Sequence, residues 1–174
     1  MEIERIPEWA LAQADEQEIA TLLARCFDTD FGGRSYFQTR QHLRLVHRRG
    51  PVVAHMALQF RAMRLGGRLI TIAGLADVAT APEWRGQGLA GHMLQTAIAE
   101  AKASPAAFML LFGTAGLYAA AGFRTIDNPL IRVEMQGAVT GQICREPSHG
   151  LMMLALRDTN WDETAHLDLL GNSF

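Results

Sequence analysis

Apolar residues recur at helical spacing in two parts of the chain. From Asp15 to Phe27, apolar side chains follow one another at three- and four-residue steps behind an acidic first turn, and from Trp84 to Lys102 they do so again. This period places apolar side chains on one face of an α-helix. We therefore expect two amphipathic helices, the second beginning inside a glycine-rich stretch. A third, short helix is expected over residues 114–121.

Strand-like patterns occupy the region between the two long helices. Residues 43–47, 52–65 and 68–80 predict a three-strand meander. Gly66-Gly67 predicts a hairpin turn, because both glycines accept positive φ. Inside the third strand, Ala73-Gly74 predicts a bulge or the close approach of another backbone.

Strands are expected again after the second long helix. The continuous apolar run at residues 107–112 predicts a strand that is buried on both faces. Later extended segments are expected from Phe123 and at residues 131–135 and 151–156, with a loop at 137–150 and a mixed tail after residue 160. The chain of 174 residues suits a single domain. The expected fold class is α/β (α+β), with a mixed, mainly antiparallel central sheet flanked by helices.

Composition narrows the class of protein. With 49% hydrophobic and 20% charged residues the chain has the balance of a soluble globular protein, and its net charge of -2 gives no field to hold nucleic acid. No apolar stretch approaches a membrane span, and no basic segment leads into an apolar run, so we expect a cytoplasmic protein without membrane attachment. Cys26 and Cys144 lack metal-ligand spacing, which predicts neither a metal site nor a disulfide framework.

A glycine-rich stretch lies where a strand is expected to pass into a helix. It reads Arg85-Gly86-Gln87-Gly88-Leu89-Ala90. Glycines allow a tight turn that brings several N–H groups together, and a helix start adds unpaired N–H donors, so the stretch suits a pyrophosphate. An ordinary helix-capping turn is the alternative. A dinucleotide-binding fingerprint does not fit, because the preceding chain is an antiparallel meander, and no Gly-Lys-Ser/Thr follows as in phosphate-loop nucleotidases.

At this stretch the sequence resembles the GCN5-related N-acetyltransferase (GNAT) superfamily. Arg85, Gly88 and Ala90 fill its signature Arg/Gln-x-x-Gly-x-Gly/Ala, and a second motif follows in Tyr118-Ala119-Ala120-Ala121-Gly122-Phe123. The likeness covers roughly residues 15 to 126. It implies the GNAT fold over residues 1–174 and transfer of an acetyl group from acetyl-CoA, without a metal, to a primary amine of a small molecule. The amine would attack directly in a ternary complex.

The resemblance also implies which residues contact acetyl-CoA. These are Val78, Ala79 and Thr80 on the strand, then Arg85, Gly86, Gln87, Gly88, Leu89 and Ala90, and later Gly113 and Thr114. A backbone N–H near Ala79 would polarise the thioester carbonyl. Tyr118 would protonate the departing thiolate, the alternative being a tyrosine that only packs at the end of a short helix.

The acceptor amine must lose a proton before it attacks. An alkylamine with a pKa near 10 is neutral about one time in a thousand at pH 7, a cost of roughly 4 kcal/mol. Asp77, His55 and Glu83 are the candidate bases, and Asp77 is favoured. The alternatives are that Asp77 is a bulge residue satisfied by backbone N–H groups, His55 a core histidine and Glu83 a helix cap.

Within the superfamily, several segments resemble aminoglycoside 2′-N-acetyltransferases and, more distantly, nodulation N-acyltransferases. These segments are residues 28–31, 52–57 and 82–87. The likeness implies an amino sugar as acceptor, with Asp30, His55 and Phe174 on the substrate side. The chain has Ala76 where those relatives carry a glutamate.

Other functions stay open on the sequence. A non-catalytic acyl-CoA-binding or sensor domain is one, and acetylation of a protein N-terminus or lysine is another. The tail at residues 159–174 could cover the acceptor site or form a homodimer contact.

Overall fold

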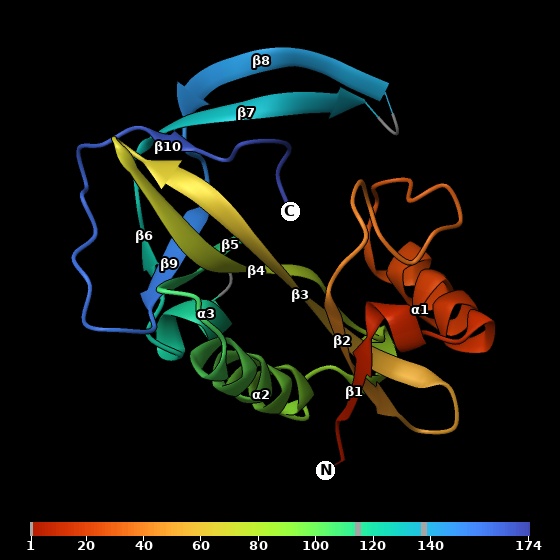
Figure 1. Ribbon diagram of the computed structural model, residues 1–174. Coiled ribbons are helices and arrows are strands. Elements are labelled where there is room, and N and C mark those ends of the chain that lie inside the picture. Colours follow the sequence, from red (N-terminus) through yellow and green to blue (C-terminus); the bar gives the residue numbers. More distant parts are fainter. Residues whose placement is uncertain (1, 114–115, 137–138) are drawn as a thin grey trace. The chain divides into compact units, whose positions relative to one another are not determined.

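The computed structural model describes residues 2–113, 116–136 and 139–174 (Figure 1). The chain forms two compact units, Met1–Gln59 with Leu75–Ala99, and Phe60–Gly74 with Glu100–Phe174. Two long strands, β3 (Val52–Leu65) and β4 (Arg68–Thr80), contribute residues to both units.

The first unit combines a short antiparallel sheet with one helix. Its elements are β1 (Glu4–Pro7), η1 (Glu8–Ala10), α1 (Gln13–Cys26), β2 (Leu43–Arg48), the first part of β3, the last part of β4, η2 (Pro82–Trp84) and most of α2 (Leu89–Ala103). Strand β1 pairs antiparallel with β2, and β2 pairs antiparallel with β3, so that Val46 lies opposite His55.

The helical spacing of α1 explains its packing. Ile19, Leu22 and Leu23 fall on one face of the helix and are buried in a cluster with Val46 and Val52 of the sheet. Each large aliphatic side chain that is buried in this way contributes about 1.5–3 kcal/mol relative to exposure. The predicted first helix is therefore confirmed, and its apolar face holds it on β2 and β3.

The second unit contains the later strands. Its elements are β5 (Phe108–Phe112), α3 (Gly116–Ala120), β6 (Arg124–Thr125), β7 (Pro129–Gln136), β8 (Val139–Pro147), β9 (Leu151–Ala155) and β10 (Leu167–Asp168), with the nearer parts of β3 and β4. Neighbouring strands follow the order β6-β9-β5-β4-β3-β10-β7-β8. Strands β7 and β8 form a long antiparallel hairpin, visible in Figure 1.

Strand β5 confirms the strand predicted from the continuous apolar run. Phe108, Met109, Leu110 and Leu111 are all at most 1% exposed, so both faces of this strand are covered. The central position of β5 between β9 and β4 explains why its sequence does not alternate.

One expectation about the chain was wrong. Residues 137–150 do not form a loop throughout, because Val139–Pro147 is strand β8. Most of β8 is exposed, so it lacks the buried alternation by which a strand is predicted. Strand β10 in the tail is two residues long, and it exists because Leu167 pairs with Leu65 of β3 and Leu130 of β7.

A side chain approaches the glycine inside β4 closely. A Cβ added to Gly74 would lie 2.6 Å from Cδ2 of the Phe174 ring. The irregular residue of this strand is Asp77, which has φ +50°.

The described pairings are mainly antiparallel, with β10 and β7 parallel, so the structure confirms the expected α+β class with a mixed sheet. Within the described ranges, no helix is both long and apolar enough to cross a membrane.

Candidate active site

The glycine loop between η2 and α2 forms an open backbone cradle. Gly86 has φ +73° and Gly88 has φ +76°, conformations that L side chains rarely adopt. A Cβ built on either glycine would meet nothing within 4 Å. Helix α2 begins at Leu89, so the first N–H groups of the helix lack intrahelical partners and carry partial positive charge. The loop can therefore receive an anionic group such as a pyrophosphate.

Arg85 ties this loop to the end of β4. Its Nε donates a hydrogen bond to the carbonyl oxygen of Thr80 at 3.0 Å, and the Cys26 thiol lies 3.5 Å from the same oxygen. Gln87 closes the loop on itself by donating from Nε2 to the carbonyl oxygen of Glu83 at 3.4 Å. Arg85 is exposed and held by its own loop, which gives the loop a defined shape.

The strand that leads to this loop is irregular at Asp77. Its φ of +50° lies in the left-handed region, which among residues other than glycine is tolerated best by Asn and Asp. In a regular strand Asp77 would face away from Ala76, but the left-handed conformation interrupts that alternation. Val78 is half-buried, and Ala79 is packed into the core of the first unit.

Polar neighbours surround Asp77. Gln41 donates from Nε2 to Oδ2 of Asp77 at 3.0 Å, and Nδ1 of His55 lies 2.8 Å from its backbone oxygen. Burial raises the pKa of Asp77 to about 6, against the lowering effects of the Arg44 charge and the Gln41 hydrogen bond, while Glu8 adds to the rise. The carboxyl group can therefore exchange a proton near neutral pH.

Arg44 and Glu8 form an ion pair whose charges act on Asp77. The Arg44 side chain is fully buried; its Nε donates to Oε2 of Glu8 at 2.8 Å, and its Nη1 donates to the carbonyl oxygen of Ser35 at 2.6 Å. Burial acts to raise the pKa of Glu8, but the hydrogen bonds and charges of Arg44 and Arg40 outweigh it, so the pKa is lowered. Glu8 is therefore ionised and compensates the buried guanidinium.

His55 is fully buried and neutral. Burial, together with the charge of Arg44, lowers its pKa to about 3. Because its Nδ1 faces a carbonyl oxygen, the tautomer carries hydrogen on Nδ1, and Nε2 is left as an acceptor. Within the part of the chain that the structure describes, Nε2 has no hydrogen-bond partner. His55 thus contacts the main chain of Asp77 and not its carboxylate.

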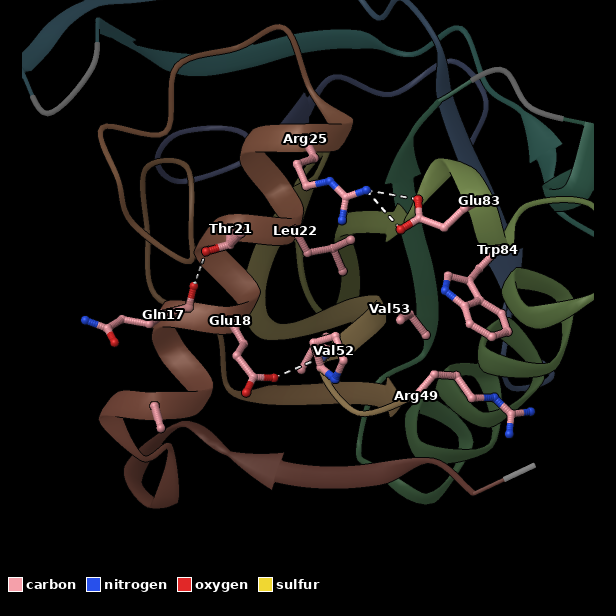
Figure 2. Close-up of a pocket in the computed structure, with 12 residues that line it drawn as sticks. Gln17, Glu18, Thr21, Leu22, Arg25, Arg49, Val52, Val53, Glu83 and Trp84 are labelled. Carbon is pink, nitrogen blue, oxygen red and sulfur yellow. Dashed lines mark hydrogen bonds and ion pairs between the residues drawn. The ribbon is translucent and has the colours of Figure 1, made fainter.

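Glu83 lies in a surface pocket of about 350 Å³ in the first unit (Figure 2). Its carboxylate pairs with Arg25 at 2.9 Å, and the neighbouring Trp84 ring is contacted by the guanidinium of Arg49. A hydrogen bond from its own backbone amide and the contact with Arg25 lower the pKa of Glu83. A lowered pKa makes Glu83 a weaker base than Asp77.

Tyr118 belongs to the second unit. It is 8% exposed, on α3, and its ring approaches so closely that a Cβ on Gly113 would lie 2.9 Å from Cε2. Phe123 packs against the ring edge to face, and Gly122 with φ +94° ends the helix as expected. Burial raises the pKa of Tyr118, so the hydroxyl keeps its proton at neutral pH. Thr114, expected beside the cofactor, lies outside the described residues.

The remaining candidates on the substrate side lie in different units. Asp30 is exposed in the first unit, and its Oδ1 accepts a hydrogen bond from the backbone N–H of Gly32 at 2.6 Å. Phe174 is in the second unit, where its ring packs on Gly74 and lies 5.4 Å from the ring of Phe112, measured between centroids.

The sequence did not point to Gln41 or Arg44 as parts of this region. Gln41 lies 36 residues from Asp77 and follows no motif. One feature of the sequence could have identified Arg44: it is a charged residue inside the apolar segment Leu43-Arg44-Leu45-Val46. Such a position requires a buried partner, but nothing in the sequence identifies Glu8 as that partner.

Known structures share this fold. The GNAT-family N-acetyltransferase YhbS from Escherichia coli, in complex with CoA, aligns with 20% identity over 96% of this chain and 88% of that chain, with a TM-score of 0.63. A GNAT-family acetyltransferase from Brucella melitensis, in complex with acetyl-CoA, aligns with 18% identity over 95% and 94%, with a TM-score of 0.59. The ribosomal-protein-S18-alanine N-acetyltransferase from Escherichia coli aligns with 17% identity over 91% and 97%, with a TM-score of 0.57.

Comparison of the chain with individual curated protein sequences found no match. In residues 2–113, 116–136 and 139–174 no group of three or more His, Cys, Asp or Glu side chains could hold a metal ion. The profile of the acetyltransferase (GNAT) domain matches residues 10–126, and the chain therefore belongs to the GNAT acetyltransferase family.

Proposed function

We propose that this chain transfers an acetyl group from acetyl-CoA to a primary amine of a small molecule by direct attack in a ternary complex. The observation that carries the proposal is the half-buried carboxyl group of Asp77, whose pKa is about 6, on the strand that leads into the glycine loop. A base with this pKa is ionised for most of the time at pH 7 and can accept a proton from an amine.

The glycine loop is the proposed binding site for the CoA pyrophosphate. The open space beside Gly86 and Gly88 admits a ligand to the backbone N–H groups at the start of α2. Two proteins of the same fold were solved with CoA and with acetyl-CoA, which supports this donor. Gln87, Leu89 and Ala90 would contribute N–H groups, and Arg85 would shape the loop through Thr80. Val78 and Ala79 of β4, and Gly113 after β5, remain proposed contacts of the cofactor.

The proposed reaction combines the transfer of the acetyl group with two proton transfers. The amine nitrogen bonds to the thioester carbonyl carbon, the carbon–sulfur bond breaks, and the electron pair leaves with sulfur. Asp77 takes the proton released by nitrogen, and Tyr118 gives its proton to the thiolate and regains one from solvent. The pKa of Tyr118 is raised by burial, so the hydroxyl is present as the acid form that this step requires.

The acceptor is proposed to be an amino sugar, as in aminoglycoside acetylation. Support comes from the exposed carboxylates of Asp28 and Asp30 after α1, which suit a cationic substrate. Phe174, at the end of the tail, is proposed to line the binding site of the acceptor amine. A tail contact in a homodimer and a protein amine as acceptor are the competing proposals, the second because one protein of this fold acts on an alanine of a ribosomal protein.

The test is release of free CoA thiol from acetyl-CoA in the presence of amino sugars, polyamines, amino acids and peptides. We expect release that depends on an amino sugar, and a loss of about 10²- to 10⁴-fold in kcat for Asp77→Asn and for Tyr118→Phe. Asn keeps the size of the side chain and tolerates the left-handed backbone, so Asp77→Asn removes only the base. CoA binding without turnover on any amine would instead favour a sensor domain.

A further inference from the structure

Two side chains of the first unit contact Asp77 in different ways. Gln41, which is 6% exposed, donates a hydrogen bond to its carboxylate, and His55, which is fully buried, donates one to its backbone oxygen. One contact acts on the group that would take the proton, and the other acts on the main chain. We propose that Gln41 and His55 are positioning residues that fix the carboxylate and the left-handed backbone of Asp77. This inference rests on the proposed role of Asp77 as the base.

His55 is suited to hold the main chain at this point. A φ of +50° is disfavoured for a residue with a Cβ, so Asp77 keeps it only where its surroundings demand it. The ring of His55 is neutral and enclosed, and its Nδ1–H can donate only in a fixed direction. A carbonyl oxygen at 2.8 Å in that direction holds residue 77 in the turned conformation.

Gln41 is suited to hold the carboxylate. It lies at the end of the segment that joins α1 to β2, and its amide faces Oδ2 of Asp77 with the NH₂ group. Its own Oε1 is buried without a hydrogen-bond partner among the described residues. A buried unpaired acceptor is unfavourable, so Gln41 carries a cost at this position that an apolar side chain would avoid.

The Gln41 contact also affects how Asp77 titrates. Burial and the charge of Glu8 on η1 raise the pKa of Asp77. The charge of Arg44 on β2 and the hydrogen bond from Gln41 lower it. His55 of β3 is neutral. Loss of the Gln41 hydrogen bond would remove one of the effects that lower the pKa of Asp77, so this pKa would rise. Asp77 would then stay protonated to a higher pH, and less of it would be available as a base at neutral pH.

The first test follows the Asp77 carboxyl directly by a ¹³C NMR titration of the free protein labelled in its aspartate carboxyl carbons, with Asp77→Asn to assign the signal. We expect a midpoint near the value of about 6 in the unaltered chain and a midpoint about one pH unit higher in Gln41→Leu. Gln59→Leu is the matched control, because Gln59 is also buried in the first unit and donates to the carbonyl oxygen of Arg40. An unchanged midpoint in Gln41→Leu, or an equal rise in Gln59→Leu, would overturn the role of Gln41.

The second test compares two buried histidines. His55→Phe should lower kcat by about tenfold while the KM for acetyl-CoA stays within about twofold, because the base is displaced and the glycine loop is unchanged. His47→Phe is the control, since His47 is 5% exposed and its Nδ1 contacts the carbonyl oxygen of Glu2. Equal losses in both variants would reject the role of His55. If His55→Phe does not fold, His55→Gln, which keeps an N–H donor, is expected to retain kcat within about threefold, and a complete loss of activity in that folded variant would reject the role.

The outcomes separate this inference from the proposed function. Full activity of Asp77→Asn would remove Asp77 as the base, and the inference would fall with it. An inactive Asp77→Asn with an unshifted titration in Gln41→Leu would leave the base in place and reject its positioning by Gln41.

Discussion

The ring of Phe174 lies directly on Gly74 of β4. A Cβ added to Gly74 would fall 2.6 Å from Cδ2 and 2.9 Å from Cγ of that ring, and Phe112 lies on the ring as well. Real Cβ atoms do not approach so closely. The ring of Phe174 can therefore occupy this place only because residue 74 has no side chain.

Gly74→Ala is therefore expected to destabilise the protein by about 1–3 kcal/mol, because the ring of Phe174 must move out of its place. Phe174→Ala in the same chain should recover part of that loss, giving a coupling of about 0.5–3 kcal/mol in a double-mutant cycle measured by urea unfolding. Gly67→Ala is the control, since its Cβ would meet nothing within 4 Å. Additive effects of the two substitutions would show that the ring does not rest on Gly74.

The pKa of Asp77 predicts how activity and stability change with pH. In the proposed reaction the ionised carboxylate is the base, so kcat/KM should fall as pH drops below about 6. The folded pKa is raised above its ordinary value of 3.8, so the stabilising contribution of the protonated group is complete below pH 3.8 and is lost as pH rises through about 6.

Asp77→Asn should then gain stability relative to the unaltered chain by up to about 3 kcal/mol between pH 4 and pH 7, from a pKa difference of about 2 at about 1.4 kcal/mol each. Urea unfolding at the two pH values measures this gain. A constant difference between the two proteins across that range would contradict the raised pKa.

The glycine loop predicts a selective loss of cofactor binding. Gly86→Ala and Gly88→Ala each place a Cβ on a left-handed residue and into the open cradle, so both backbone strain of about 1–2 kcal/mol and obstruction of the ligand are expected. Gly50→Ala carries the same backbone strain at φ +80°, in the turn between β2 and β3. Calorimetric titration with CoA should show weaker binding for the first two variants and unchanged binding for Gly50→Ala.

The buried pair of Arg44 and Glu8 predicts a large effect on stability. Arg44→Met removes a fully buried guanidinium and leaves Glu8, which is 15% exposed, without its main partner, so a loss of about 3–5 kcal/mol is expected. Arg25→Met breaks a pair whose side chains are 51% and 54% exposed and should cost less than about 1 kcal/mol. Similar losses in both variants, measured by thermal unfolding, would contradict the burial of Arg44.

The glycine loop and the meander were predictable because their signals are local. Positive φ at Gly86 and Gly88 follows from residue type and from their place between a strand and a helix, and α1 follows from the period of Ile19, Leu22 and Leu23. Strand β8 gave no such signal, because an edge strand that exposes most of its residues needs no apolar alternation. Its pairing with β7 is decided by the partner strand.

The surroundings of Asp77 could not be predicted from the sequence, although the residue itself could be identified. The family, the order of most elements, the glycine loop between a strand and a helix, and the presence of a carboxylate on the strand before that loop all followed from the sequence. Only the fold brought Gln41 and His55 into contact with Asp77, exposed it to the charges of Arg44 and Glu8, and raised its pKa to about 6. The reason is physical: a turn or a helix face is encoded by neighbouring residues, whereas desolvation and hydrogen bonding arise between residues that are distant in sequence and meet only when the chain has folded.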